Sequence, residues 1–383
     1  RGLALEIAHK DSASLLRRLN PGDWLYALAL AGGALFALRQ YGGFMDIYDK
    51  AILLFTVPGL AVMGFAWKPF RVFLAAATAL ALVSISLYQG DLARAEQVFF
   101  LKYLISSQTA IMWMSALFFI ATGAFLLGLV ARSDFADATG SVLTWCAVTM
   151  GTTGLMVRWY ESYLIGSDVG HIPLSNLYEV FVLFALMTGL LYLYYEGRYA
   201  TRRMGAFVLL VISAAVAFLL WYTYSREAHE IQPLIPALQS YWMKVHVPAN
   251  FIGYGAFALA AMVGVADLLV RKGILASRLP PAEVLDDVMY KAIAIGFAFF
   301  TIATILGALW AAEAWGTYWQ WDPKETWAFI VWLNYATWLH IRLTKGLRGP
   351  MLAWWAIVGL VVTAFAFVGV NMFLSGLHSY GSL

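Results

Sequence analysis

Residues 108–131 read QTAIMWMSALFFIATGAFLLGLVA, a run without one charged side chain. A helix needs about 20 apolar residues to cross the hydrocarbon core of a bilayer, so this run predicts a transmembrane helix. Ten further apolar runs, before and after this one in the sequence, reach or approach that length. They lie near 24–40, 51–67, 70–89, 139–158, 176–195, 204–223, 247–270, 290–312, 323–343 and 351–375. The sequence therefore predicts an all-α polytopic bundle of about 11 transmembrane helices.

Composition supports a membrane protein. Of 383 residues, 62% are hydrophobic and only 12% are charged, and the mean hydropathy is +0.74. A soluble domain is nearer about 25% charged. The net charge of +3 is too small to argue for nucleic acid as a partner.

The Lys and Arg residues predict the orientation, because cytoplasmic loops carry an excess of them. With 11 spans, 17 of the 25 lie on the side of the N-terminus. The N-terminus is therefore predicted inside and the C-terminus outside. The eight on the outer side are Arg39, Lys50, Arg94, Lys102, Arg158, Arg226, Lys244 and Lys324.

No internal repeat or low-complexity linker divides the chain. We predict an N-terminal inside tail with three added membrane spans over residues 1–107, followed by one membrane domain over 108–383. The single cysteine, Cys146, lies in an apolar run, so the chain has neither a CxxC redox pair nor a CxxCH haem-attachment motif.

Six histidines occur, and three have simple interpretations. His9 in the inside tail and His229 in the polar stretch SREAHE are predicted to be solvated. His171, in GHIPLSNLYE, is predicted to be a turn residue ahead of a helix capped by Ser175 or Asn176.

The other three histidines suggest chemistry. His246 stands at the outer start of one predicted span, and His378 follows the outer end of the last, so topology brings both to one membrane face. His340 lies within the span 323–343, near its inner end. Imidazole in or beside a membrane segment is costly unless it is paired or bound, and neutral imidazole is a common axial ligand of haem iron. The alternative for each is an interfacial histidine bonded to water or backbone.

The outer segment EAWGTYWQWDPKETW, residues 313–327, favours the chemical interpretation. It contains four of the chain's 16 tryptophans: Trp315, Trp319, Trp321 and Trp327. Tryptophan favours membrane interfaces, which explains one or two of them. Four beside each other predict a wall for a flat apolar ligand, because indole faces pack on a ring system while their N–H groups reach polar edges.

Asp322 begins the sequence Asp322-Pro323-Lys324-Glu325, which reads as the N-cap, N1, N2 and N3 positions of a helix. The acidic N3 residue completes a capping box. Starting this helix is the predicted immediate role of Asp322, and direct contact with a cofactor is the alternative.

These residues resemble the tryptophan-rich WWD haem-handling family, and within it the CcsA (ResC-like) component of the System II cytochrome c synthase. The resemblance rests on WGTYWQWDPKETW, flanked by His246 and His378, with His340 in the span that follows this segment, and covers roughly residues 108–383. It implies that His246 and His378 are axial ligands of an outer haem (haem b, non-covalent) below the tryptophan-rich loop, with Trp315, Trp319, Trp321, Asp322 and Trp327 at the cofactor. It implies that His340 belongs to an inner membrane haem site.

The implied activity is attachment of haem to the CxxCH of an apocytochrome c at the outer face of the bacterial inner membrane, as a holocytochrome c synthase (lyase) component. The resemblance further implies a CcsB (ResB-like) membrane subunit as partner, because fused synthases carry that domain and this sequence does not show it. Arg158, Arg226, Lys244 and Lys324 are the outer candidates for holding haem propionates.

Three alternatives remain open. A related haem exporter that loads a haem chaperone shares the tryptophan-rich loop. A dihaem cytochrome b-type electron-transfer protein would pair histidines within the spans, where only His340 lies. An ordinary transporter with interfacial histidines is the third.

Overall fold

The computed structural model describes residues 19–376. His9 and His378 therefore lie outside the described residues. The chain divides into two compact units, Arg1–Ala76 and Ala77–Leu383. The predicted domain boundary at residue 107 stays a prediction.

The first unit holds two helices and the first turns of a third. Asn20 and Asp23 form a capping box at the start of the first helix. Arg71 forms an ion pair with the Asp23 carboxylate and donates from Nε to the carbonyl of Gly64 at 2.7 Å, which ties the three segments together. These helices are α2 (Pro21–Tyr41), α3 (Ile47–Ala66) and α4 (Pro69–Tyr88).

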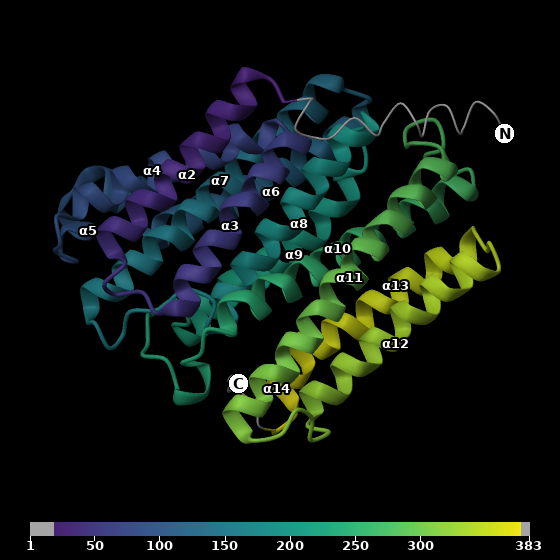
Figure 1. Ribbon diagram of the computed structural model, residues 1–383. Helices are drawn as coiled ribbons and strands as arrows, with labels where there is room; N and C mark the ends of the chain where they lie inside the picture. The colour runs from purple at the N-terminus through teal and green to yellow at the C-terminus, as the bar shows by residue number, and fades with distance from the viewer. Residues whose placement is uncertain (1–18, 377–383) are drawn as a thin grey trace. The chain divides into compact units, whose positions relative to one another are not determined.

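The second unit contains the tryptophan-rich segment, and its described part consists of helices joined by turns and loops, with no strand (Figure 1). The prediction of an all-α polytopic fold is confirmed. Its elements are α5 (Arg94–Gln97), η2 (Leu101–Ile105), α6 (Ser107–Ala131), α7 (Asp134–Ile165), α8 (Leu177–Tyr199), α9 (Gly205–Arg226), η3 (Pro236–Leu238), α10 (Met243–Arg271), α11 (Ala282–Trp315), α12 (Pro323–Thr344), α13 (Pro350–Ala364), η4 (Phe365–Gly369) and α14 (Val370–Phe373).

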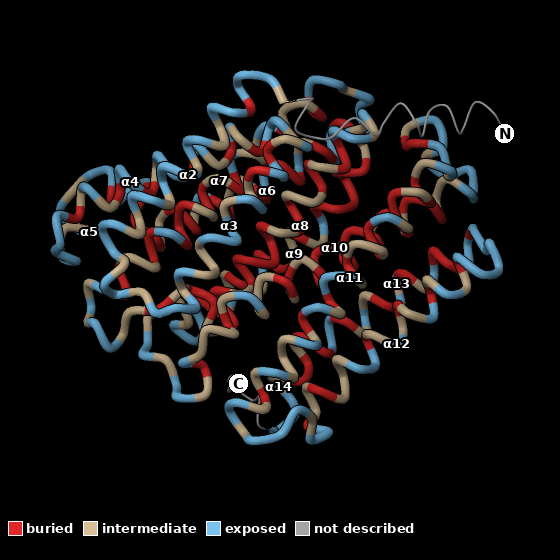
Figure 2. The backbone as a smooth tube through the Cα atoms, viewed as in Figure 1, coloured by how far each residue is buried: buried red, intermediate tan, exposed pale blue. Residues whose placement is uncertain are grey.

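Helix α10 is the centre of this unit. It packs against α8, α9, α11 and α13, and most of its apolar residues are buried, as the red stretches of Figure 2 show. The ring of Phe257 on α10 stacks on that of Tyr335 on α12, with centroids 3.6 Å apart. Helices α10, α11, α12 and α13 therefore form the frame around the tryptophan-rich loop.

Two buried ion pairs fix opposite ends of the unit. Arg158 of α7 donates from Nε to Glu179 of α8 at 2.8 Å, and both side chains are almost fully buried. Arg342 of α12 donates to both carboxylate oxygens of Asp286 of α11, at 3.1 and 2.5 Å. Removing one partner of such a pair costs about 3–5 kcal/mol, because a buried charge is left without compensation.

Some helices extend well past the apolar runs that predicted them. Helix α7 has 32 residues and α11 has 34, against predicted spans at 139–158 and 290–312. The extra turns contain charged residues among apolar ones, so the length of the apolar run alone underestimated these helices. Ser133, the N-cap of α7, accepts from the backbone of Ala136 and starts that helix early.

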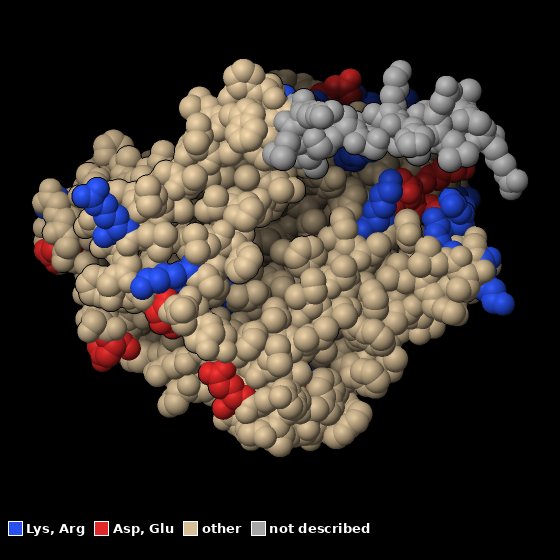
Figure 3. Space-filling model, in the orientation of Figure 1, with Lys and Arg blue, Asp and Glu red and all other residues tan. Residues whose placement is uncertain are grey.

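Ten helices of the described chain are long and apolar enough to cross a membrane. The remaining predicted span, 323–343, forms the 22-residue helix α12, but it is not among those ten because tryptophan, asparagine, histidine and charged residues lower its hydropathy. Most of the face in Figure 3 carries no charged residue, and Lys and Arg gather where α12 turns into α13. The protein is a multi-pass membrane protein, and its orientation stays a prediction.

Candidate functional site

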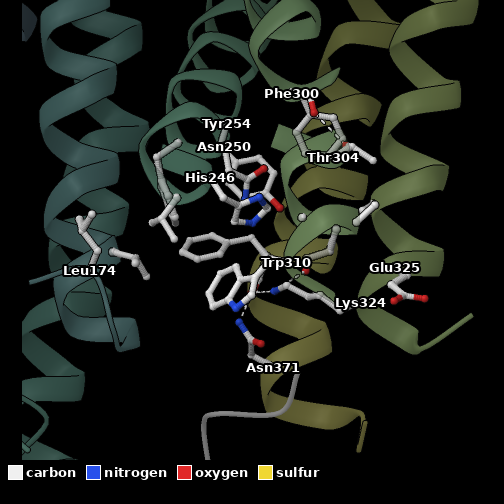
Figure 4. A pocket seen from close by; sticks show the side chains of 18 of the residues that line it. Leu174, His246, Asn250, Tyr254, Phe300, Thr304, Trp310, Lys324, Glu325 and Asn371 are labelled. Atoms are coloured by element: carbon white, nitrogen blue, oxygen red, sulfur yellow. Dashed lines mark hydrogen bonds between the residues drawn. The ribbon is translucent and has the colours of Figure 1, made fainter. Parts of the chain in front are cut away.

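The tryptophan-rich loop covers a cavity of about 210 Å³, which we call the outer pocket. Side chains from α10, α11, α12 and the segment η4–α14 meet there, and Figure 4 shows His246, Lys324 and Asn371 pointing toward the same space from three of these elements. Most of the lining is aromatic or aliphatic. Its polar members include His246, Asn250, Thr304, Lys324 and Asn371.

His246 stands in the first turns of α10 and is held by α11. Its Nδ1 lies 2.7 Å from the carbonyl oxygen of Ala303. A carbonyl oxygen can only accept, so Nδ1 carries the hydrogen and the ring lone pair is on Nε2. The ring of Trp310 meets the imidazole edge to face at 5.7 Å. This hydrogen bond selects the tautomer and ring orientation that an axial metal ligand needs.

A glycine makes this approach possible. Gly307 lies one helical turn after Ala303, on the same face of α11, and a Cβ there would come 2.9 Å from Cε1 of His246. Any larger residue would push the imidazole away from the Ala303 carbonyl. Gly307 is therefore a positioning residue for His246, and nothing in the sequence pattern marked it.

The four tryptophans of residues 313–327 divide into two groups. Trp315 and Trp319 line the outer pocket, and Nε1 of Trp319 is buried without a hydrogen-bond partner in the described structure. Trp321 lies in the loop and is mostly exposed, and Trp327 packs on Phe365 with centroids 4.4 Å apart. Direct contact with a ligand in the outer pocket thus suits Trp315 and Trp319, whereas Trp321 and Trp327 do not line this pocket.

Asp322 caps α12 as predicted. Its carboxylate accepts from the backbone of Lys324 at 3.2 Å, and Glu325 accepts from the backbone of Asp322 at 3.3 Å, which completes the capping box. Glu325 also accepts from the backbone of Gln320 at 2.7 Å. The box therefore fixes both the helix start and the loop before it. At the other end of the loop, Gly316 has φ +79°, a left-handed cap of α11 that suits glycine.

The C-terminal segment meets this cap. Gly376 lies so close to Asp322 that an added Cβ would be 2.1 Å from a carboxylate oxygen. Gly376 is the last described residue, two positions before His378. The described part of the chain therefore ends beside the Asp322 cap.

Lys324 faces the outer pocket from the first turn of α12. Its Nζ donates to the carbonyls of Ala366 and Phe367 at 3.2 and 3.4 Å, and the Asn371 amide donates to Phe367 at 2.8 Å. These carbonyls belong to the π-helical segment η4, and π-bulges often mark functional sites. An ammonium has three donors, so Lys324 can hold this segment and still donate to a bound carboxylate.

A more open hollow of about 880 Å³, which we call the vestibule, adjoins the outer pocket. The two share Ser175, Asn176, Leu238 and Asn371 in their linings. Arg226 lines the vestibule, so it can reach a ligand that extends from the pocket. The outer pocket alone is below the roughly 300–1,000 Å³ of ordinary ligand sites, and the vestibule supplies the missing room.

Arg158, another predicted propionate partner, is already engaged. Besides Glu179, it donates to the backbone carbonyls of His229 and Glu230 at 2.6 and 3.3 Å. It therefore fixes the segment that borders the vestibule. Lys244 is half-buried in the first turn of α10.

The other histidines of the described chain do not line the outer pocket. His171 is buried, with its ring nitrogens 2.7 Å from Val169 O and 3.1 Å from Ser175 Oγ. Asn176 caps α8, so the predicted turn role is confirmed. His229 is half-buried, with Nδ1 unpaired in the described structure. This differs from the prediction of a solvated side chain, because Arg158 binds the His229 carbonyl and draws this backbone inward.

His340 is exposed on α12. This helix is unbroken from Pro323 to Thr344, so His340 lies about 26 Å along its axis from Pro323 at a rise of 1.5 Å per residue. His340 therefore cannot share a ligand with His246. Its predicted place in a separate inner site stays a prediction.

Comparisons with known proteins identify the family of this chain. A family model described as "Cytochrome C assembly protein" matches residues 174–378. The chain is 35% identical over 295 residues to "Cytochrome c biogenesis protein CcsA" of Parasynechococcus marenigrum (strain WH8102), which covers 68% of this chain and 94% of that relative. It is 39% identical over 236 residues to the protein of the same name from Chlamydomonas reinhardtii, which covers 59% of this chain and 64% of that relative.

Among solved structures, the fold is similar to that of "Cytochrome c Heme Lyase CcmF", with a TM-score of 0.54 and 17% identity. That match covers 70% of this chain and 49% of the other, so the chain spans about half of that structure. Since the family model covers the pocket-forming helices and the relatives match most of the chain, this protein belongs to the cytochrome c assembly protein family and acts in cytochrome c biogenesis.

Proposed function

We propose that the outer pocket holds haem b non-covalently, as a substrate, and presents it for attachment to the CxxCH of an apocytochrome c. The observation that carries the proposal is His246, whose hydrogen bond to Ala303 places its lone pair on Nε2 at an aromatic pocket. The residues present fit haem in two further respects. Trp319 has a buried N–H donor without a partner, and Lys324 supplies a cation for a propionate.

The second axial ligand in this proposal is His378. It follows Gly376, the last described residue, which lies against Asp322 at one end of the loop. Trp315 and Trp319 would pack on the porphyrin faces, while Trp321, Trp327 and the Asp322 cap hold the loop that carries them.

In the proposed reaction, each thiol of CxxCH adds across one haem vinyl group. The sulfur bonds to one vinyl carbon and the thiol hydrogen goes to the other, so the addition balances without an oxidant. The substrate supplies the thiols, and this chain positions the haem and limits its exposure to water. The apocytochrome histidine would then replace His246 or His378 on the iron.

His340 enters the proposal as part of an inner haem site used in delivery. Its side chain is exposed, so the described part of this chain does not enclose it. We therefore propose that a CcsB/ResB-like subunit covers this face of α12, and that the complex acts as a holocytochrome c synthase in the bacterial inner membrane with its active face toward the periplasm or exterior.

The test compares wild type, His246→Ala and the double variant with His378→Ala, each co-expressed with a ResB-like chain and a CxxCH reporter. A pyridine haemochrome spectrum of the reporter distinguishes thioether-bound haem from haem with intact vinyl groups. Attachment should fall in His246→Ala and be partly restored by external imidazole. Normal attachment in the double variant would refute the ligand assignment, and haem release without thioether formation would favour an exporter.

A further inference from the structure

A second apolar hollow, the lateral groove, lies between α11 and α12. It has a volume of about 440 Å³ and is lined by Thr301, Thr304 and Ile305 of α11, Trp319 and Trp321 of the loop, and Phe329 and Trp332 of α12. Ile305, Trp321 and Phe329 are exposed. The groove therefore opens on the outside of the helix bundle and not on the vestibule.

The groove offers a ligand aromatic faces and almost no polar group. Its two hydroxyls are engaged internally, because Thr304 donates to Phe300 O at 2.8 Å and Thr301 donates to Phe297 O at 2.7 Å. The indole of Trp332 in turn donates to Thr301 at 2.9 Å. A ligand that enters this groove must therefore be largely apolar.

The rings in the groove have a definite arrangement. Phe329 and Trp332 are nearly parallel, with an interplanar angle of 11°. Trp319 and Trp321 each stand nearly perpendicular to Phe329, at 82° and 80°. Flat faces beside ring edges suit a planar conjugated ligand better than an acyl chain.

Trp319 is the wall between the groove and the outer pocket. It lines both, as does Thr304. Its Nε1 is buried and has no partner in the described structure. A lipid tail cannot satisfy this donor, whereas a planar ligand with carboxylate or nitrogen atoms at its edge can.

The groove also lies in line with His340. Phe329, Trp332, Ala336 and His340 follow one another at spacings of three and four residues on α12, which places them on one face of the helix. His340 is exposed on that face. This face of α12 thus extends from His340 to the lateral groove, which Trp319 also lines.

We propose that the lateral groove is the access site through which haem passes from the membrane side of α12 into the outer pocket, with Trp319 as its gate. This inference rests on the proposed function, and it assigns a route where that proposal assigns only an end point. The competing occupants of the groove are a lipid chain and a helix of another subunit.

The experiment places purified protein, with its partner and without haem, in phosphatidylcholine–phosphatidylglycerol nanodiscs and follows the Soret band after haem addition. Ile305→Trp fills the groove from outside the outer pocket. Ile302→Trp is the matched control, because Ile302 is also exposed on α11 but does not line the groove. Ile305→Trp should slow loading about tenfold, equivalent to ~1.4 kcal/mol of activation free energy, with the final spectrum unchanged.

Ile302→Trp should load at the wild-type rate. Equal rates in all three proteins, or equal slowing in both variants, would overturn the access site, since neither depends on the groove. A lower final amplitude at an unchanged rate would also overturn it, because the groove would then belong to the resting site. If His246→Ala gave the same final spectrum as the wild type, the proposed function would be refuted instead. The two failures are therefore distinguishable.

Discussion

The imidazole of His246 and the backbone carbonyl of Ala303 lie 2.7 Å apart across the α10–α11 interface. These residues are 57 positions apart in the sequence, and the contact exists only where α11 has no Cβ at Gly307 to obstruct it. The orientation of the proposed ligand is therefore determined by a neighbouring helix and not by the α10 sequence around it.

The first prediction concerns Gly307. In Gly307→Ala the new methyl group would contact Cε1 of His246 and displace the ring, at a cost of roughly 1–3 kcal/mol. Haem affinity should fall, and the two-histidine spectrum should shift. Haem titration with optical and resonance Raman spectra measures both effects.

Gly123→Ala is the control for this prediction. Gly123 is also inside a helix, and nothing lies within 4 Å of an added Cβ. It should raise thermal stability slightly, because alanine favours helix by about 0.8–1.0 kcal/mol over glycine, with normal haem binding. Unchanged affinity and spectrum in Gly307→Ala would show that His246 has room to move.

The second prediction separates capping from charge at Asp322. Asp322→Asn and Asp322→Ser should retain most of the attachment activity, because both residues cap helices well. Asp322→Ala should lose about 0.5–2 kcal/mol of local stability and show more hydrogen exchange in the first turn of α12. Equal loss of activity in all three variants would mean that the negative charge itself acts on haem or substrate.

The third prediction distinguishes the roles of Lys324 and Arg158. Lys324→Met should weaken haem binding but leave binding of haem dimethyl ester unchanged, because the ester lacks the propionate charges. Arg158→Met should instead destabilise the protein by about 3–5 kcal/mol, since Glu179 is left buried and unpaired. Equal sensitivity of both variants to esterification would contradict this division.

The sequence predicted what depends on composition and local pattern. Apolar runs located the helices of the bundle, and Asp322 with Glu325 predicted the capping box that the structure contains. His171 was also predicted as a turn residue, because the signals for the cap of α8 are local.

What the sequence could not predict depends on contacts between distant segments. The role of Gly307, the π-helical carbonyls that receive Lys324, and the division of the four tryptophans of residues 313–327 each need helices placed side by side. Arg158 was predicted as a propionate partner on topology alone, and its buried pair with Glu179 emerges only when α7 and α8 are packed together.

The last prediction concerns His340. It lies about 26 Å along α12 from Pro323 and is exposed on the face that leads to the lateral groove. If it hands haem toward the outer pocket, His340→Ala should reduce outer occupancy in cells where haem is supplied from the cytoplasm. In whatever haem remains, the two-histidine spectrum should be unchanged, because His246 is not touched.

Haem content and the optical spectrum of the purified complex measure the two effects separately, and Thr337→Ala, at a neighbouring exposed position of α12, is the control. Full outer occupancy in His340→Ala would eliminate the inner site from the route, and an altered spectrum would mean that this residue acts on the outer site after all.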